Sequence, residues 1–115
     1  MSLAQSLNPQ KKSRHELLKL AADIAAKLRS VSGVKRIVLF GSAAEDRFRV
    51  GSDLDFLLIF GSLDELKEGR NGIRGLGLLH SDIPIDLVFV TEDRFNAKKD
   101  IGGVCFVAHK DGVEL

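Results

Sequence analysis

Three short hydrophobic runs, each next to or containing an unexpected polar group, constrain the fold of this chain most strongly. Residues 35–40 end at the pair Gly41-Ser42. Residues 54–60 begin beside Asp53 and include Asp55, and residues 84–90 include Asp86. Short apolar runs bounded by turn residues are typical of buried strands. The sequence therefore predicts three strands that carry carboxylates or a Gly-Ser turn.

The first two aspartates are predicted to share one face of a strand. Side chains alternate across a strand, so Asp53 and Asp55 lie on the same face as Leu57 and Ile59. Both faces are apolar beyond Asp55, which indicates a central strand covered on both sides. With Cα atoms about 6.5–7 Å apart, the two carboxylates can converge on one divalent ion or a close pair of ions. For this pair alone, the alternative is a solvated strand end.

Asp86 stands between an apolar tripeptide and four further apolar residues, and we expect it to be buried. A buried carboxylate without a partner is energetically costly, so it requires compensation. A metal cation is one source; a salt bridge to Arg36, Arg74 or Arg94 is the other. Three carboxylates on successive predicted strands, close to a Gly-Ser turn, favour the metal.

The turn after the first strand has the chemistry of a phosphate site. Gly41 permits a positive φ and a close approach to the backbone. Ser42 can cap a following short helix or donate a hydrogen bond to a phosphate oxygen. Backbone N–H groups at such turns attract anions. The alternative is an ordinary turn such as Gly61-Ser62, which no paired carboxylates follow at the same distance.

The combination of these motifs resembles the polymerase-β-type nucleotidyltransferase superfamily, and the short chain most resembles the minimal nucleotidyltransferase (MNT) proteins of bacteria and archaea. The resemblance spans residues 34–90 and rests on Gly41-Ser42, Ser52-Asp53-Leu54-Asp55 and Asp86. It implies an α/β (α+β) fold with a mixed sheet of about four to five strands flanked by helices. Members transfer a nucleoside monophosphate from a nucleoside triphosphate (NTP) to a hydroxyl group and release pyrophosphate.

The resemblance also implies a role for each matching residue. Asp53 and Asp55 would bind two catalytic Mg²⁺ ions, and Asp86 would complete the metal site and help activate the attacking hydroxyl. The nucleotide-binding positions would be Gly41, Ser42 and Ser52. Many minimal members are encoded beside a helical HEPN protein and act as its antitoxin, some by adenylylating it. A hydroxyl on such a partner is therefore the expected acceptor, and ATP the expected donor.

One departure from the family pattern leaves a second hypothesis open. Family members commonly carry Arg-Gly where this chain has Glu45-Asp46. Two acids in place of the base would weaken triphosphate binding, or Arg47 or Arg49 would take over part of the triphosphate binding. The second hypothesis is a catalytically weak protein that acts by binding a partner. The third, a purely structural α/β domain, leaves Asp86 unexplained.

Composition bears on the class of partner and on the location of the protein. A net charge of +1 and seven aromatic residues, all Phe, give no indication of a nucleic-acid partner. Cys105 is expected to be a buried apolar residue. We expect a cytoplasmic protein without a membrane span, with a disordered segment at 1–12 and a single domain over 13–115. So short a domain is expected to form a homo-oligomer or a hetero-complex that supplies acceptor contacts.

The periodicity and capping residues predict the remaining elements. A capping box at Ser13–Glu16 opens a helix to about Ser30, and Ser62 begins a helix that four glycines would break or make mobile. Thr91 is expected to cap a short helix. The predicted helices are 13–30, 42–46, one from 62 and 92–99, and the predicted strands are 35–40, 54–60, 84–90 and 104–108.

Overall fold

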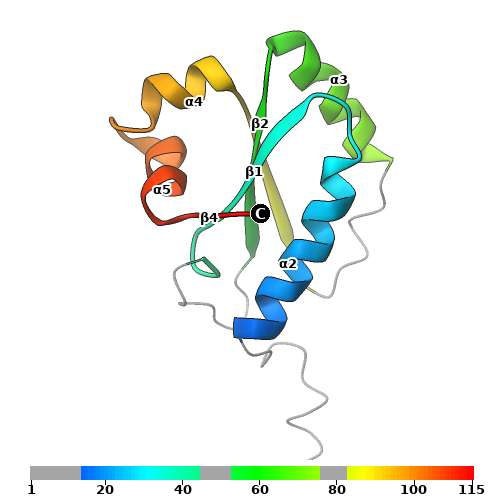
Figure 1. Ribbon diagram of the computed structural model, residues 1–115, viewed down its shortest axis with the longest axis vertical. Helices are drawn as coiled ribbons and strands as arrows, with labels where there is room; N and C mark the ends of the chain where they lie inside the picture. The colour runs from blue at the N-terminus through cyan, green and yellow to red at the C-terminus, as the bar shows by residue number, and fades with distance from the viewer. Residues whose placement is uncertain (1–13, 45–52, 76–82) are drawn as a thin grey trace, which may run out of the picture.

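The computed structural model describes residues 14–44, 53–75 and 83–115, so the predicted disordered segment at 1–12 lies outside the described residues. The described elements are α2 (Arg14–Arg29), β1 (Val34–Phe40), β2 (Leu54–Phe60), α3 (Leu63–Arg74), β3 (Ile85–Thr91), α4 (Glu92–Lys98), α5 (Gly103–Asp111) and β4 (Val113–Glu114) (Figure 1). No described helix is long and apolar enough to cross a membrane.

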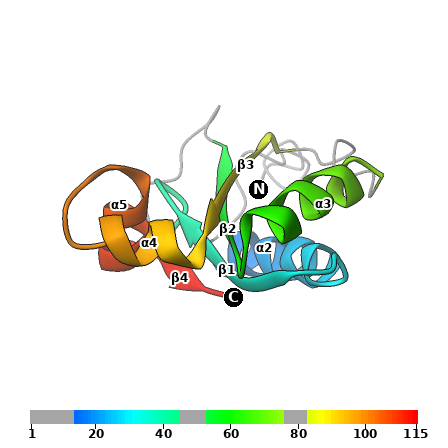
Figure 2. The same cartoon turned by 90° about the horizontal axis from the view of Figure 1, so that it is seen from above.

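The four strands form one mixed sheet in the order β3-β2-β1-β4. Strand β1 pairs antiparallel with both β2 and β4, whereas β2 pairs parallel with β3. A parallel pair needs a crossover connection, and here α3 lies within it. Seen from above, the sheet separates α2 and α3 on one side from α4 and α5 on the other (Figure 2). The predicted mixed sheet flanked by helices is therefore confirmed.

Two hydrophobic cores hold the helices against the sheet. The larger one packs α2 and α3 on the sheet face that carries Leu54, Phe56, Leu58 and Phe60. The smaller one packs α4 and α5 on the face that carries Leu57 and Ile59. Every residue of β2 except Asp55 is buried, which confirms the predicted central strand.

Helix α3 is continuous, so the prediction of a broken helix is wrong over its described length. Ser62 caps it, because its Oγ accepts a hydrogen bond of 3.2 Å from the Glu65 N–H. Gly69 lies directly against the Phe60 ring, where a Cβ atom would overlap it. The glycine that weakens this helix locally therefore also allows it to approach the sheet closely. Ile73, in the last turns of α3, is buried in the larger core.

The predicted strand at 104–108 is wrong: these residues lie in helix α5. Cys105 and Ala108, three residues apart, are buried against the sheet, while Val104 and Val107 are exposed. Residues three apart lie on one face of a helix. A run of five apolar residues is too short to distinguish a helix from a strand by its periodicity. The final strand begins only after Gly112, at Val113. The expectation that Cys105 is buried is confirmed.

The predictions for α2 and α4 hold within a residue or two. Helix α2 matches the predicted 13–30, although Ser13 of its capping box lies outside the described residues. Thr91 caps α4, since its Oγ1 accepts a hydrogen bond of 3.2 Å from the Arg94 N–H. The predicted helix at 42–46 differs: its described part, 42–44, is a turn.

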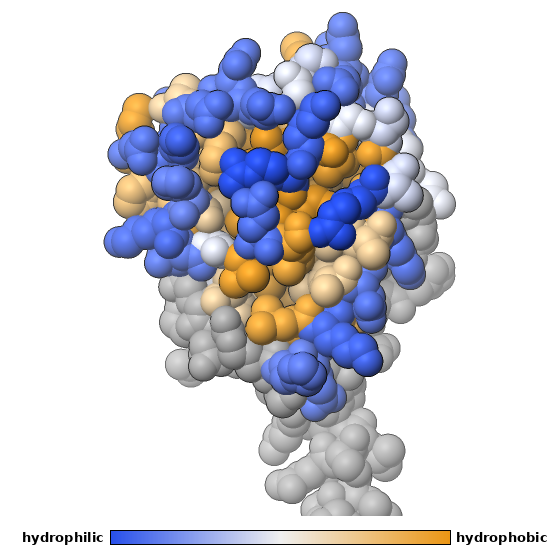
Figure 3. Space-filling model, in the orientation of Figure 1, coloured by the Kyte–Doolittle hydropathy of each residue, from blue (hydrophilic) through white to orange (hydrophobic). Residues whose placement is uncertain are grey.

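On the face shown in Figure 3, hydrophobic residues reach the surface between the hydrophilic helix surfaces.

Candidate functional site

The register of the sheet places two of the predicted site residues, Asp55 and Asp86, in one row across the strands. Asp55 of β2 is the partner of Asp86 on β3 and of Phe40 on β1. Neighbouring strands lie about 4.8 Å apart, so the Asp55 and Asp86 backbones are adjacent. By the alternation of side chains, this row lies on the sheet face that α4 and α5 cover farther along. Asp53 lies two residues before Asp55, at the same end of the sheet.

Backbone hydrogen bonding holds the aspartate segments in this register. The Leu54 N–H, between the two aspartates, donates a hydrogen bond of 2.8 Å to the Pro84 carbonyl oxygen. Leu54 itself is fully buried in the larger core. The start of β2 is therefore fixed to the start of β3, which sets Asp53 and Asp55 beside Asp86.

Gly41 links the Gly-Ser turn to the carboxylates. Its φ is +78°, a conformation that residues with a Cβ atom rarely adopt. A Cβ atom on Gly41 would also overlap the Asp55 carboxylate. The predicted positive φ is confirmed, and the group that approaches the backbone is a side chain of the site itself. The following Ser42 is half-buried in the turn at 41–44.

The prediction that Asp86 is buried is wrong, because its side chain is exposed. Strand β3 is at the edge of the sheet, and its burial pattern shows only Val90 as buried. The apolar neighbours of Asp86 instead pack on the two cores from either face. The proposed salt bridge is also not formed, since Asp86 pairs with none of Arg36, Arg74 and Arg94 within the described parts of the chain.

Arg36 has a different partner, at the other end of β1. Its Nη2 lies 2.8 Å from Glu114 Oε1, and its Nε donates a second hydrogen bond of 3.0 Å to Oε2. The guanidinium also lies 5.1 Å from the centre of the Phe95 ring. The hydrogen bond raises the pKa of Arg36 and lowers that of Glu114. This pair fastens β4 to β1 and engages Arg36 at Glu114, away from the aspartates.

The pKa of Asp55 shows that its surroundings disfavour the ionised carboxylate. Burial, and after it the negative charges of Asp86 and Asp53, together raise its pKa from 3.8 to about 6. The three carboxylates therefore act on each other as a cluster, although only Asp55 is half-buried. A bound cation would relieve both the repulsion and the cost of burial.

The carboxylates fit a magnesium site that is completed by substrate, rather than a site made wholly of protein. In the described parts of the chain, no three His, Cys, Asp or Glu side chains are grouped tightly enough to hold a metal by themselves. Mg²⁺ typically keeps several waters and uses one or two carboxylates together with substrate phosphates. Asp55 with Asp53 or Asp86 can supply such a set. Two exposed carboxylates also leave room for water and phosphate.

Part of the predicted site falls outside the described residues, and the sequence did not single out one residue that borders the site. Ser52 and the pair Glu45-Asp46 lie outside the described residues. Phe40, half-buried beside Asp55, gives the site an apolar border that the sequence did not single out. Its position depends on the pairing of β1 with β2, so only the register could have revealed it.

Comparison with known proteins identifies the family. The model of the nucleotidyltransferase domain family matches residues 19–112, which contain all the aspartates and the Gly-Ser turn. The chain belongs to the nucleotidyltransferase domain family. No curated protein matches it significantly.

The fold of this nucleotidyltransferase domain is similar to a solved structure. That structure is a crystal structure from Sulfolobus solfataricus, described as a "putative nucleotidyltransferase", with a TM-score of 0.57 and 23% sequence identity. The match covers 88% of this chain and 80% of that chain. At this identity the likeness supports the fold alone, while the family match rests on the sequence.

Proposed function

We propose that this nucleotidyltransferase domain transfers a nucleoside monophosphate, AMP in the first instance, from an NTP to a hydroxyl acceptor in the presence of Mg²⁺. The observation that carries the proposal is the row in which Asp55 and Asp86 are register partners beside the Gly41 turn. The raised pKa of Asp55 supports it, because burial and the neighbouring carboxylates disfavour its ionised form and a bound cation would relieve both effects.

Asp53, Asp55 and Asp86 would hold the metal ions, and the turn at 41–44 would hold the triphosphate. In that turn, the Ser42 hydroxyl and backbone N–H groups can donate hydrogen bonds to phosphate oxygens. We also assign Ser52 a nucleotide-binding role from its place in the motif. When bound, two Mg²⁺ ions would supply charge neutralisation for the phosphates and a lower pKa for the acceptor hydroxyl.

In the transfer, the acceptor oxygen forms a bond to the α-phosphorus while the bond between the α-phosphorus and the bridging oxygen to the β-phosphate breaks. Pyrophosphate leaves with that electron pair, and the acceptor proton passes to Asp86. The exposure of Asp86 at the sheet edge suits this role, because an acceptor can reach it from solvent. The domain mainly positions the reactants and balances charge.

We further propose that the acceptor is a hydroxyl group on a partner protein of the helical HEPN type, with this chain acting as its antitoxin. An open row of carboxylates beside an edge strand can receive a side chain presented by a folded protein. A chain that only binds such a partner is the alternative, and the same experiment separates the two.

The test is transfer of label from an NTP labelled at its α-phosphate, with Mg²⁺, to the product of the neighbouring gene. We expect label from ATP with the wild-type chain and none with Asp53→Ala or Asp55→Ala. Asp23→Ala, at an exposed position of α2 on the other side of the sheet, is the matched control and should transfer normally. Label that persists without Asp53 and Asp55 would refute the site. No label from any of the four NTPs, with the partner still bound, would favour the binding protein.

A further inference from the structure

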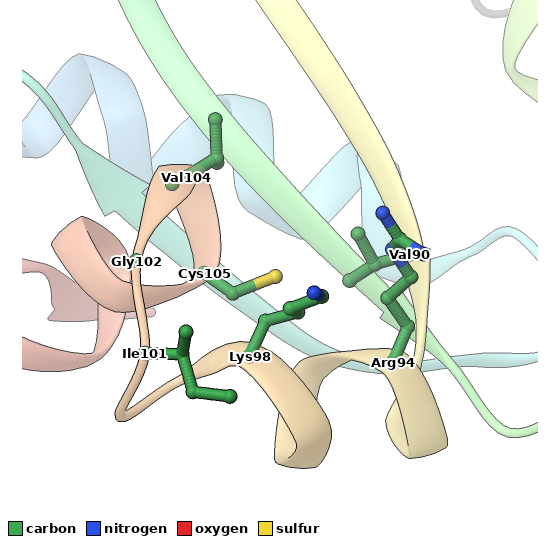
Figure 4. Close-up of a pocket in the computed structure, with 8 residues that line it drawn as sticks. Val90, Arg94, Lys98, Ile101, Gly102, Val104 and Cys105 are labelled. Atoms are coloured by element: carbon green, nitrogen blue, oxygen red, sulfur yellow. The ribbon is translucent and has the colours of Figure 1, made fainter.

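The same face of the sheet carries a second recess, at the end opposite the carboxylates. A pocket of about 450 Å³ is lined by Val90 at the end of β3, by Arg94 and Lys98 of α4, and by the segment 101–105 (Figure 4). Val90 follows Asp86 by four residues, or about 13 Å along the strand. The volume lies within the range of about 300–1,000 Å³ of ligand pockets. The pocket is therefore separate from the proposed transfer site.

The pocket has a positive lining. Arg94 and Lys98 contribute two cations, and no acidic side chain lines it. Neither cation forms an ion pair with another described residue. Burial raises the pKa of the Cys105 thiol, and the charges of Arg94 and Lys98 oppose that shift, so both cations lie near the sulfur. Asp93 and Asp100, which adjoin lining residues in the sequence, do not line the pocket, and Asp100 lies 3.9 Å from His109 Nε2.

Exposed hydrophobic side chains continue from the pocket onto the surface. Ile101 is 74% exposed, Val104 39% and Val107 36%, and only Leu63 among the other described large hydrophobic residues is comparably exposed. Val104 and Val107 are three residues apart on α5 and therefore share a face. Hydrophobic residues also come to the surface at the left margin of Figure 3, where the connection between α4 and α5 lies. Such a group of exposed apolar residues is typical of an interaction site.

We propose that the pocket and these three residues form a docking surface for an acidic, amphipathic peptide segment of another protein. An aliphatic side chain of the segment would enter the pocket beside Ile101 and Val104, and its carboxylates would pair with Arg94 and Lys98. Because the exposed apolar residues extend beyond the pocket to Val107, a partner that covers them all is longer than a small molecule. A second copy docking symmetrically would place the same two cations against each other, so charge favours an acidic partner.

The test begins with selection from a random dodecapeptide library displayed on phage against the full chain. We expect enriched peptides that carry at least two acidic residues next to an aliphatic or aromatic residue. Synthetic forms of these peptides are then measured by fluorescence polarisation. Binding should weaken about tenfold or more with Ile101→Ser, from the lost apolar contact, and similarly with Lys98→Glu. It should also weaken with rising salt.

Matched control variants distinguish peptide binding at this surface from nonspecific binding elsewhere on the chain. Leu63→Ser removes a hydrophobic residue that is 57% exposed on α3, and Lys67→Glu reverses an exposed charge there; both should leave the affinity within twofold. Gly102 lines the pocket with an extended backbone, and a Cβ atom there meets nothing within 4 Å, so Gly102→Leu adds bulk at the pocket without a clash in the folded protein and should weaken binding. Circular dichroism confirms that fold. The proposal would be overturned if acidic peptides were not enriched. It would also be overturned if Lys98→Glu and Gly102→Leu bound the peptides as tightly as the wild-type chain.

Discussion

Replacing Asp55 with asparagine isolates the cost of placing a negative charge in the carboxylate cluster, because the two side chains have nearly the same shape. The pKa of Asp55 is raised from 3.8 to about 6. At about 1.4 kcal/mol per pKa unit, that shift sets an upper limit of about 3 kcal/mol on the cost in the free energy of unfolding. The side chain is only half-buried, so solvent screening reduces the expected cost to about 1 kcal/mol.

The sign follows from the direction of the shift. A group with a raised pKa in the folded state contributes its full stability below the unfolded pKa and loses that stability as the pH rises through about 6. Without metal, Asp55→Asn should therefore be more stable than wild type by about 1 kcal/mol at pH 7.5. The difference should shrink towards zero near pH 4.

Urea unfolding followed by circular dichroism in EDTA measures this difference at several pH values. Asp23→Asn, at an exposed position on α2, is the control and should keep the wild-type pH dependence. The reasoning would be refuted if Asp55→Asn were less stable than wild type at pH 7.5, or if their difference did not change with pH.

Three further substitutions test the turn beside the site, a glycine of α3 and the ion pair between β1 and β4. Gly41→Ala should destabilise the fold by about 1–3 kcal/mol in urea unfolding, because the φ is positive and the new Cβ would overlap Asp55. Gly72→Ala, whose Cβ would meet only Val31 at 3.6 Å, should instead stabilise by about 0.5–1 kcal/mol; loss of stability there would contradict the comparison. Arg36→Ala should return the lowered pKa of Glu114 towards its usual value, measured by NMR titration, and cost at most about 1 kcal/mol for an exposed pair. An unchanged Glu114 pKa would show that the ion pair does not form in solution.

The sequence predicted those parts of the fold whose pattern had only one interpretation. Strand β2 is apolar on both faces, and only a central strand needs that pattern. Ser62 and Thr91 each precede a helix that they cap, since their hydroxyls can accept the first free N–H groups. Local chemistry determined these elements, and no long-range information was required.

The failures came where distant parts of the chain decide the outcome. Asp86 lies in a run as apolar as a central strand, but β3 is at the sheet edge, and strand order cannot be inferred from one run. The apolar run in α5 is too short to show its period, and only its packing against β1 and β2 selects the helix. The row formed by Asp55, Asp86 and Phe40 depends likewise on register.

The most direct test of the proposed transfer site is to locate by NMR where a metal–nucleotide complex binds. Mn²⁺ in place of Mg²⁺, added with a non-hydrolysable ATP analogue to the isotope-labelled chain, broadens the NMR signals of nearby amides. We expect the amides of Gly41, Asp55 and Asp86 to broaden most strongly, this broadening to be abolished in Asp55→Asn, and Cys105 at the other pocket to broaden much less. Broadening centred elsewhere, or unchanged in Asp55→Asn, would contradict the assignment of this end of the sheet as the nucleotidyl-transfer site.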